Sequence, residues 1–126
     1  MLIIGLIFAG LAIALHFFIF YLESFAWTTK ALSVFGMTVE GAEATREMAF
    51  NQGFYNLFLA LMALVGIFVR PTSLAAGNAL LFAGLGSMLA AALLLFVTSP
   101  DKRSAAIKQG VFPLLSIIFV LVGSMS

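Results

Sequence analysis

Two adjacent stretches of this chain decide its fold. Residues 48–69 read MAFNQGFYNLFLALMALVGIFV, and residues 73–97 read SLAAGNALLFAGLGSMLAAALLLFV. Neither stretch contains an acidic, basic or histidine side chain. An α-helix needs about 20 predominantly apolar residues to cross the hydrocarbon core of a bilayer. The two stretches therefore predict two membrane-spanning helices, separated by a break at Pro71, which disfavours helix at the residue before it.

Two further stretches outside this pair have the same character. Residues 2–26 contain only His16 and Glu23 as ionisable groups. Pro100 and Asp101 suit the first turn of another helix. Proline lacks an N–H, and the N–H groups of the first turn have no partner within the helix; an acid favours the positive end of the helix dipole. One transmembrane domain over residues 1–126 is expected, with helices at about 2–26, 40–69, 73–97 and 100–124 and a short interfacial helix within residues 28–38.

The composition excludes most other classes of protein. Hydrophobic residues make up 63% of the 126 residues and charged residues 9%, whereas soluble domains are about half apolar and about a quarter charged. There is no cysteine, one histidine, and a net charge of +1, so we expect no disulfide, no metal site and no basic surface for nucleic acid. The sequence predicts an all-α integral membrane four-helix bundle.

The distribution of basic residues predicts how the bundle is oriented. Lysine and arginine favour the cytoplasmic side when they lie in short loops. This rule places both the N terminus and the C terminus outside the cytoplasm. The loops after the first and third predicted helices carry Lys30, Arg46, Lys102, Arg103 and Lys108, whereas the opposite side carries only Arg70.

Polar side chains gather in the half of the bundle that this orientation places next to the cytoplasm. Polar residues at membrane depth are costly and need a physical reason. One reason is a site for a small or lipophilic ligand or a partner; the other is hydrogen bonding between helices, worth about 1 kcal/mol per residue. Both interpretations stay open. The candidate ligand-binding residues are His16, Glu23, Glu47, Asn51, Gln52, Tyr55, Asn56, Lys108 and Gln109.

The third predicted helix carries small residues every four positions. Such a stripe allows close helix packing in a membrane, either within the bundle or against a second copy or a partner membrane protein. No phosphate-binding glycine loop or nucleophile elbow accompanies it, so the cofactor, if any, stays unknown. The stripe consists of Ala79, Ala83, Ser87 and Ala91.

Several segments resemble DUF1304, a family of small four-helix bacterial membrane proteins of unknown function. The segment Asn51-Gln52-Gly53-Phe54-Tyr55-Asn56 is similar to the family's most distinctive stretch. Tyr21-Leu22-Glu23 with Phe25-Ala26-Trp27-Thr28, and Lys108-Gln109-Gly110 with Pro113, are similar to its first and last helices. The resemblance implies a multi-pass protein of the bacterial inner (plasma) membrane, and it implies no activity.

Three functions remain compatible with these residues. The first is binding of a ligand or partner through the polar cluster. The second is an enzyme acting on a lipophilic substrate, because the chain also resembles the MAPEG membrane enzymes. Those enzymes have a polar second helix, and the residues that would play similar parts here are Arg46, Asn51, Gln52 and Asn56. The third is a proton-coupled transporter similar to the small multidrug carriers. Those carriers use a carboxylate deep in the first helix, where this chain has His16 and places Glu23 nearer the interface.

Overall fold

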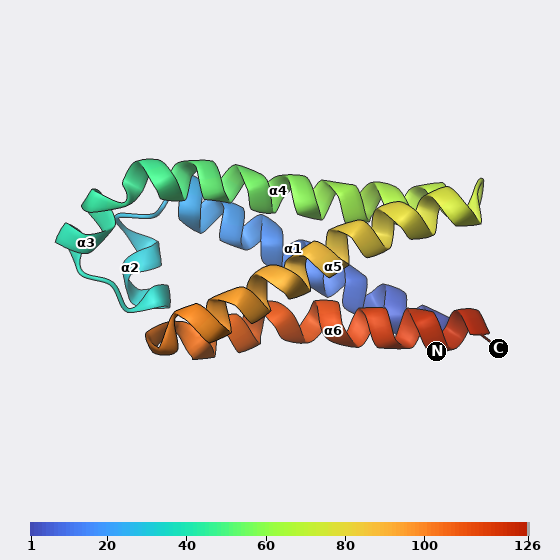
Figure 1. Ribbon diagram of the computed structural model, residues 1–126. Helices are drawn as coiled ribbons and strands as arrows, with labels where there is room; N and C mark the ends of the chain where they lie inside the picture. Colours follow the sequence, from blue (N-terminus) through green and yellow to red (C-terminus); the bar gives the residue numbers. More distant parts are fainter. Residues whose placement is uncertain (126) are drawn as a thin grey trace.

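Four long helices form the protein, as the computed structural model shows for residues 1–125 (Figure 1). Each is long and apolar enough to cross a membrane, which confirms the predicted all-α membrane bundle. The helices are α1 (Leu2–Ser24), α4 (Arg46–Val69), α5 (Leu74–Thr98) and α6 (Arg103–Met125), the last preceded by the 3₁₀ turn η1 (Pro100–Lys102).

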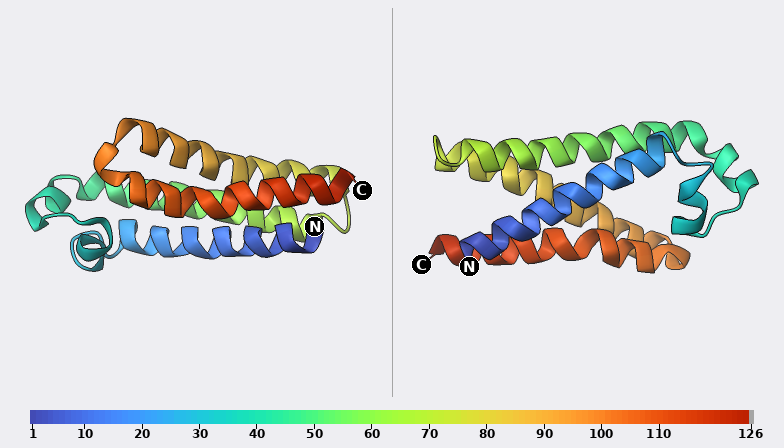
Figure 2. Two further views of the ribbon diagram at one scale, coloured as in Figure 1. Left: turned by 90° about the horizontal axis from the view of Figure 1, so that it is seen from below. Right: turned by 180° about the vertical axis from the view of Figure 1, so that it is seen from behind.

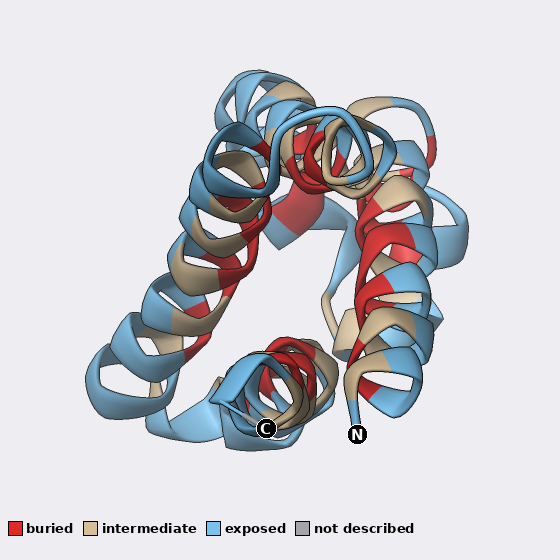
Figure 3. Ribbon diagram, turned by 90° about the vertical axis from the view of Figure 1, so that its right-hand side faces the viewer, coloured by how far each residue is buried: buried red, intermediate tan, exposed pale blue. Residues whose placement is uncertain are grey.

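The four helices form a ring in which each long helix packs against two others. Helices α1 and α5 both pack against α4 and α6. The start of α1 and the end of α6 lie together at one end of the bundle, and the short helices lie at the other (Figure 2). Buried residues lie on the inner faces of the helices (Figure 3). The core combines small and large residues, namely Ala9, Ala12, Ile13, Ala60, Ala63, Leu81, Leu85, Met88 and Val120.

Glycines set the closest approaches between helices. A Cβ added at Gly66 would lie 2.5 Å from the Leu81 backbone nitrogen and 2.8 Å from the Gly77 carbonyl oxygen. One added at Gly5 would lie 2.7 Å from the Val120 backbone nitrogen. Lipid tails are as apolar as leucine, so membrane helices associate through such close packing rather than through burial of apolar area.

The small-residue stripe of α5 lies outside this packing. Ala79, Ala83, Ser87 and Ala91 are all exposed in the chain described to residue 125. The bundle instead packs on the neighbouring positions of α5, which are Gly77, Leu81, Gly84, Leu85, Met88 and Ala92.

The connection between α1 and α4 holds two short helices, α2 (Lys30–Phe35) and α3 (Val39–Ala44). Gly36 ends α2 in the left-handed conformation (φ +67°), which glycine adopts without a Cβ clash. The Thr38 hydroxyl accepts a hydrogen bond from the Gly41 N–H and caps α3. The chain breaks at Thr45 (φ −112°, ψ 9°), so the expected continuous helix 40–69 is two helices. The Thr45 hydroxyl also accepts a hydrogen bond from the Trp27 indole N–H at 3.1 Å, which ties the break to the end of α1.

Candidate functional site

A cavity of about 460 Å³ lies at the end of the bundle that carries the short helices. At this end α4 diverges from α5 and α6, and α2 lies beside the gap (Figure 1). We call it the loop-end cavity. Its lining comes from α1, α2, α4, α5, η1, α6 and the connections on either side of α2: Ile19, Glu23, Trp27, Phe35, Met37, Met48, Gln52, Asn56, Ala91, Leu94, Leu95, Thr98, Lys102, Ala105 and Gln109.

The central polar contact of the cavity joins α1 to α4. The Asn56 side-chain amide donates a hydrogen bond to the Glu23 carboxylate at 2.5 Å, and it also lies 3.3 Å from the Gln52 carbonyl oxygen. Both side chains are half-buried. Within residues 1–125, Glu23 has no basic side chain within 4 Å; the one ion pair there joins Arg46 and Glu43 at 3.9 Å. Glu23 is thus a carboxylate that meets an amide donor but no positive charge.

The close packing of α1 on α4 positions this contact. A Cβ added at Gly53 would lie 3.0 Å from the Ser24 backbone nitrogen and 3.1 Å from the Phe20 carbonyl oxygen. The Ser24 hydroxyl donates to the Phe50 carbonyl oxygen at 2.9 Å. Because Gly53 lies three residues before Asn56, the two residues share one face of α4, and the approach at Gly53 brings Asn56 opposite Glu23.

The structure brings only part of the predicted cluster to the cavity. Glu23, Gln52, Asn56 and Gln109 line it. Lys108 is exposed and lines a separate hollow of about 160 Å³, where Gln109 also lies. Gln109 is therefore shared between the two hollows.

The other predicted residues lie elsewhere. His16 is buried among the helices, and its Nδ1 hydrogen-bonds the Ala12 carbonyl oxygen of the preceding turn at 2.8 Å. Glu47, Asn51 and Tyr55 form an exposed row on α4 outside the lining of the loop-end cavity. The Asn51 amide donates to the Glu47 carbonyl oxygen at 3.3 Å, a contact within its own helix.

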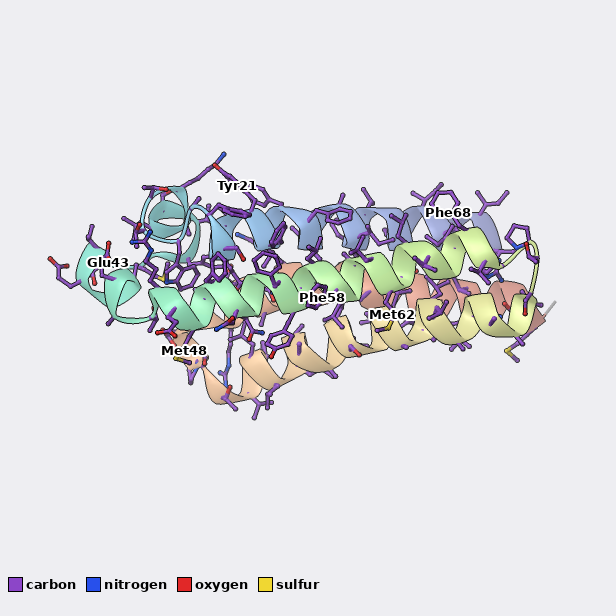
Figure 4. All side chains as sticks on the ribbon, turned by 90° about the horizontal axis from the view of Figure 1, so that it is seen from above. Tyr21, Glu43, Met48, Phe58, Met62 and Phe68 are labelled. Carbon is purple, nitrogen blue, oxygen red and sulfur yellow. The ribbon has the colours of Figure 1, made fainter. Side chains whose placement is uncertain are left out.

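Sequence reasoning missed the aromatic and basic parts of the cavity. The rings of Trp27 and Phe35 lie 5.7 Å apart between centroids, and both line it. Lys102 reaches it from η1. Met48, at the start of α4, lies on the side of that helix next to α5 (Figure 4). An aromatic residue at the end of a membrane helix and a lysine in a loop are typical interfacial residues, so neither carried a distinguishing signal.

The model of the family DUF1304, described as protein of unknown function, matches residues 10–121. The chain belongs to the DUF1304 family. No curated protein and no solved structure matches it. The match covers every residue that lines the loop-end cavity. In this DUF1304 protein, the segment Asn51–Asn56 that carried the resemblance supplies Gln52 and Asn56 to the cavity and Gly53 to the contact with α1.

Proposed function

We propose that this DUF1304 protein binds a small lipophilic molecule with a polar head in the loop-end cavity. The observation that carries the proposal is that this cavity combines polar side chains with a larger number of apolar ones. The polar ones include Glu23, Gln52, Asn56 and Gln109, and three of these residues carry neutral amides that can both donate and accept hydrogen bonds. A volume of about 460 Å³ falls within the usual range of small-molecule sites, roughly 300–1,000 Å³.

Apolar residues of the cavity lining also reach the outer surface of the bundle. Leu94 is 64% exposed and Met48 is 73% exposed, although both also line the cavity. In a membrane these exposed faces contact lipid. A lipophilic ligand could therefore enter from the bilayer between α4 and α5, with its polar head directed to Glu23 and Asn56.

The ligand should be detectable as a bound mass. Native mass spectrometry of the protein, gently extracted from its own membrane, is expected to show a reproducible adduct. The double variant Gln52→Leu, Gln109→Leu should reduce the adduct about tenfold, which corresponds to about 1.4 kcal/mol of binding free energy. Asn51→Leu is the matched control, because Asn51 is adjacent in sequence but lies outside the cavity lining. A bare wild-type chain, or equal loss in both variants, would contradict the proposal.

We further propose that the cavity faces the cytoplasm and that the protein lies in the bacterial inner membrane with both termini outside the cytoplasm. Support comes from the basic residues near the cavity end, Lys30, Lys102 and Arg103, against Arg70 at the other end. A reporter fused to the C terminus that is active only outside the cytoplasm should be active, whereas one fused within residues 36–38 should not. The reverse pattern would overturn the orientation.

Two other functions depend on the same carboxylate. A small proton-coupled transporter needs a titratable group that faces a cavity, and Glu23 meets that requirement. A membrane enzyme of the MAPEG kind would need an acid or base beside its substrate. Glu23 would serve in that role, because it is the carboxylate that lines the loop-end cavity. Assembly with a second copy or a partner membrane protein stays a prediction for the exposed small-residue stripe of α5.

A further inference from the structure

We propose that the head of the bound molecule is zwitterionic, with an ammonium group held by Glu23 and a phosphate group held by Lys102. This inference rests on the proposed function, because it names the chemical class of the ligand in the loop-end cavity. The shared chemistry is an aminoalkyl phosphate, carried either by a membrane amphiphile or by a free soluble headgroup. The apolar residues of the cavity lining, among them Leu94 and Leu95, favour the amphiphile.

The lining of the cavity holds two side chains of opposite charge. These are one carboxylate, that of Glu23, and one ammonium, that of Lys102. Both residues are half-buried, and in the part of the chain described here they form no ion pair with each other within 4 Å. Half-buried charges that lack an oppositely charged partner are unfavourable. A ligand that carries both opposite charges would partner both residues while adding no net charge to the site.

The aromatic residues of the lining indicate where the ammonium group of the ligand would lie. Trp27 and Phe35 line the cavity with Glu23, and the hydrogen bond from the Trp27 indole to Thr45 holds that ring in place. Aromatic faces attract ammonium groups through the ring quadrupole. A carboxylate beside two aromatic rings is therefore a site for a positive nitrogen, particularly an alkylated one.

The position of Lys102 indicates where the phosphate group of the ligand would lie. Lys102 lies in η1, where the chain turns from α5 to α6, and together with its neighbour Asp101 it also lines the adjoining hollows of about 160 and about 440 Å³. Lysine binds phosphate as a mobile point charge. From this turn it can meet a phosphate at the mouth, while the alkyl part lies along Leu94 and Leu95 toward the lipid.

The test uses the fluorescence of Trp27, which is the chain's one tryptophan. The full-length protein in dodecyl maltoside micelles is titrated with four probes: dodecylphosphocholine, dodecyltrimethylammonium, dodecyl phosphate, and phosphocholine without an alkyl chain. Dodecylphosphocholine is expected to bind about tenfold more tightly than any of the other three, which is the effect of one additional favourable contact of about 1.4 kcal/mol.

Variants separate the roles of the two charges. Glu23→Gln keeps an oxygen that can accept the Asn56 hydrogen bond and removes the negative charge, so it should abolish the preference over dodecyl phosphate. Lys102→Gln should abolish the preference over dodecyltrimethylammonium. Glu40→Gln and Lys30→Gln are charge-matched controls outside the cavity lining, and they should retain both preferences.

Each contrary result has a distinct meaning. Equal binding of the three dodecyl probes to the wild-type protein would overturn the zwitterionic head and leave the proposed lipophilic ligand intact. Phosphocholine binding as tightly as dodecylphosphocholine would overturn the amphiphile. Saturable binding of none of the probes, together with no adduct in the native mass spectrum, would remove the proposed function itself.

Discussion

Replacing Gly66 by alanine is expected to destabilise the bundle by about 3 kcal/mol, the upper range for overpacking a tightly packed interior. The added Cβ would lie 2.5 Å from the Leu81 backbone nitrogen and 2.8 Å from the Gly77 carbonyl oxygen. Both neighbours are backbone atoms of α5, so no side-chain rotation can relieve the clash. Helix α5 would have to move away from α4 as a unit. The loss is measured as the free energy of unfolding in mixed micelles with increasing sodium dodecyl sulfate.

Gly86→Ala is the matched control for this prediction. Gly86 also lies within a membrane helix, but no atom lies within 4 Å of a Cβ added there. Alanine is favoured over glycine in a helix by about 1 kcal/mol, so this variant should be at least as stable as the wild-type protein. Equal destabilisation of the two variants would show that Gly66 does not set the distance between α4 and α5.

Replacing Asn56 by leucine is expected to cost about 2 kcal/mol, typical of losing a hydrogen bond to a charged group. The variant removes the amide that donates to Glu23 and leaves that carboxylate half-buried without a donor. The same unfolding measurement applies, carried out on protein that has been stripped of ligand. Asn51→Leu, with the same change on an exposed position of α4, should lie within about 0.5 kcal/mol of the wild-type protein.

A double variant identifies the cause of this loss. If the cost of Asn56→Leu comes from the unpaired carboxylate, then Glu23→Leu combined with Asn56→Leu should recover much of the stability, because two apolar side chains replace a polar pair. The coupling free energy of the double-mutant cycle measures the contact. Additive losses would show that the two residues stabilise the bundle independently and that the contact is not its polar centre.

The sequence predicted the four spans because membrane helices are a local property. A run of about 20 apolar residues must satisfy its own backbone hydrogen bonds in lipid and therefore becomes a helix. The break at Thr45 was not predictable in this way. Residues 40–47 are polar enough to lie outside the apolar spans, and the break is tied to the end of α1 by Trp27, a contact between residues 18 positions apart.

In the candidate site, too, the sequence showed which residues are polar but not which of them reach the cavity. Asn51 and Gln52 are neighbours with similar side chains, yet only Gln52 lines the loop-end cavity. Successive helical residues point about 100° apart, so the rotation of α4 about its axis decides which of them faces the cavity. That rotation follows from the close approach of Gly53 to Ser24 and Phe20 of α1. The spacing of residues along the sequence does not reveal this contact between two helices.

By itself, therefore, the sequence determined that this is a four-helix membrane protein with polar residues gathered toward one end, since chain length, apolar runs and proline or glycine breaks act within a few turns. Only the tertiary structure decided that Glu23 meets Asn56, that His16 is a packed residue, and that Trp27 and Lys102 belong to the cavity. The physical reason is that helix rotation and divergence are set by contacts between distant segments: Gly53 lets α4 approach α1 at the cavity end, whereas Gly66 lets α4 approach α5 at the opposite end.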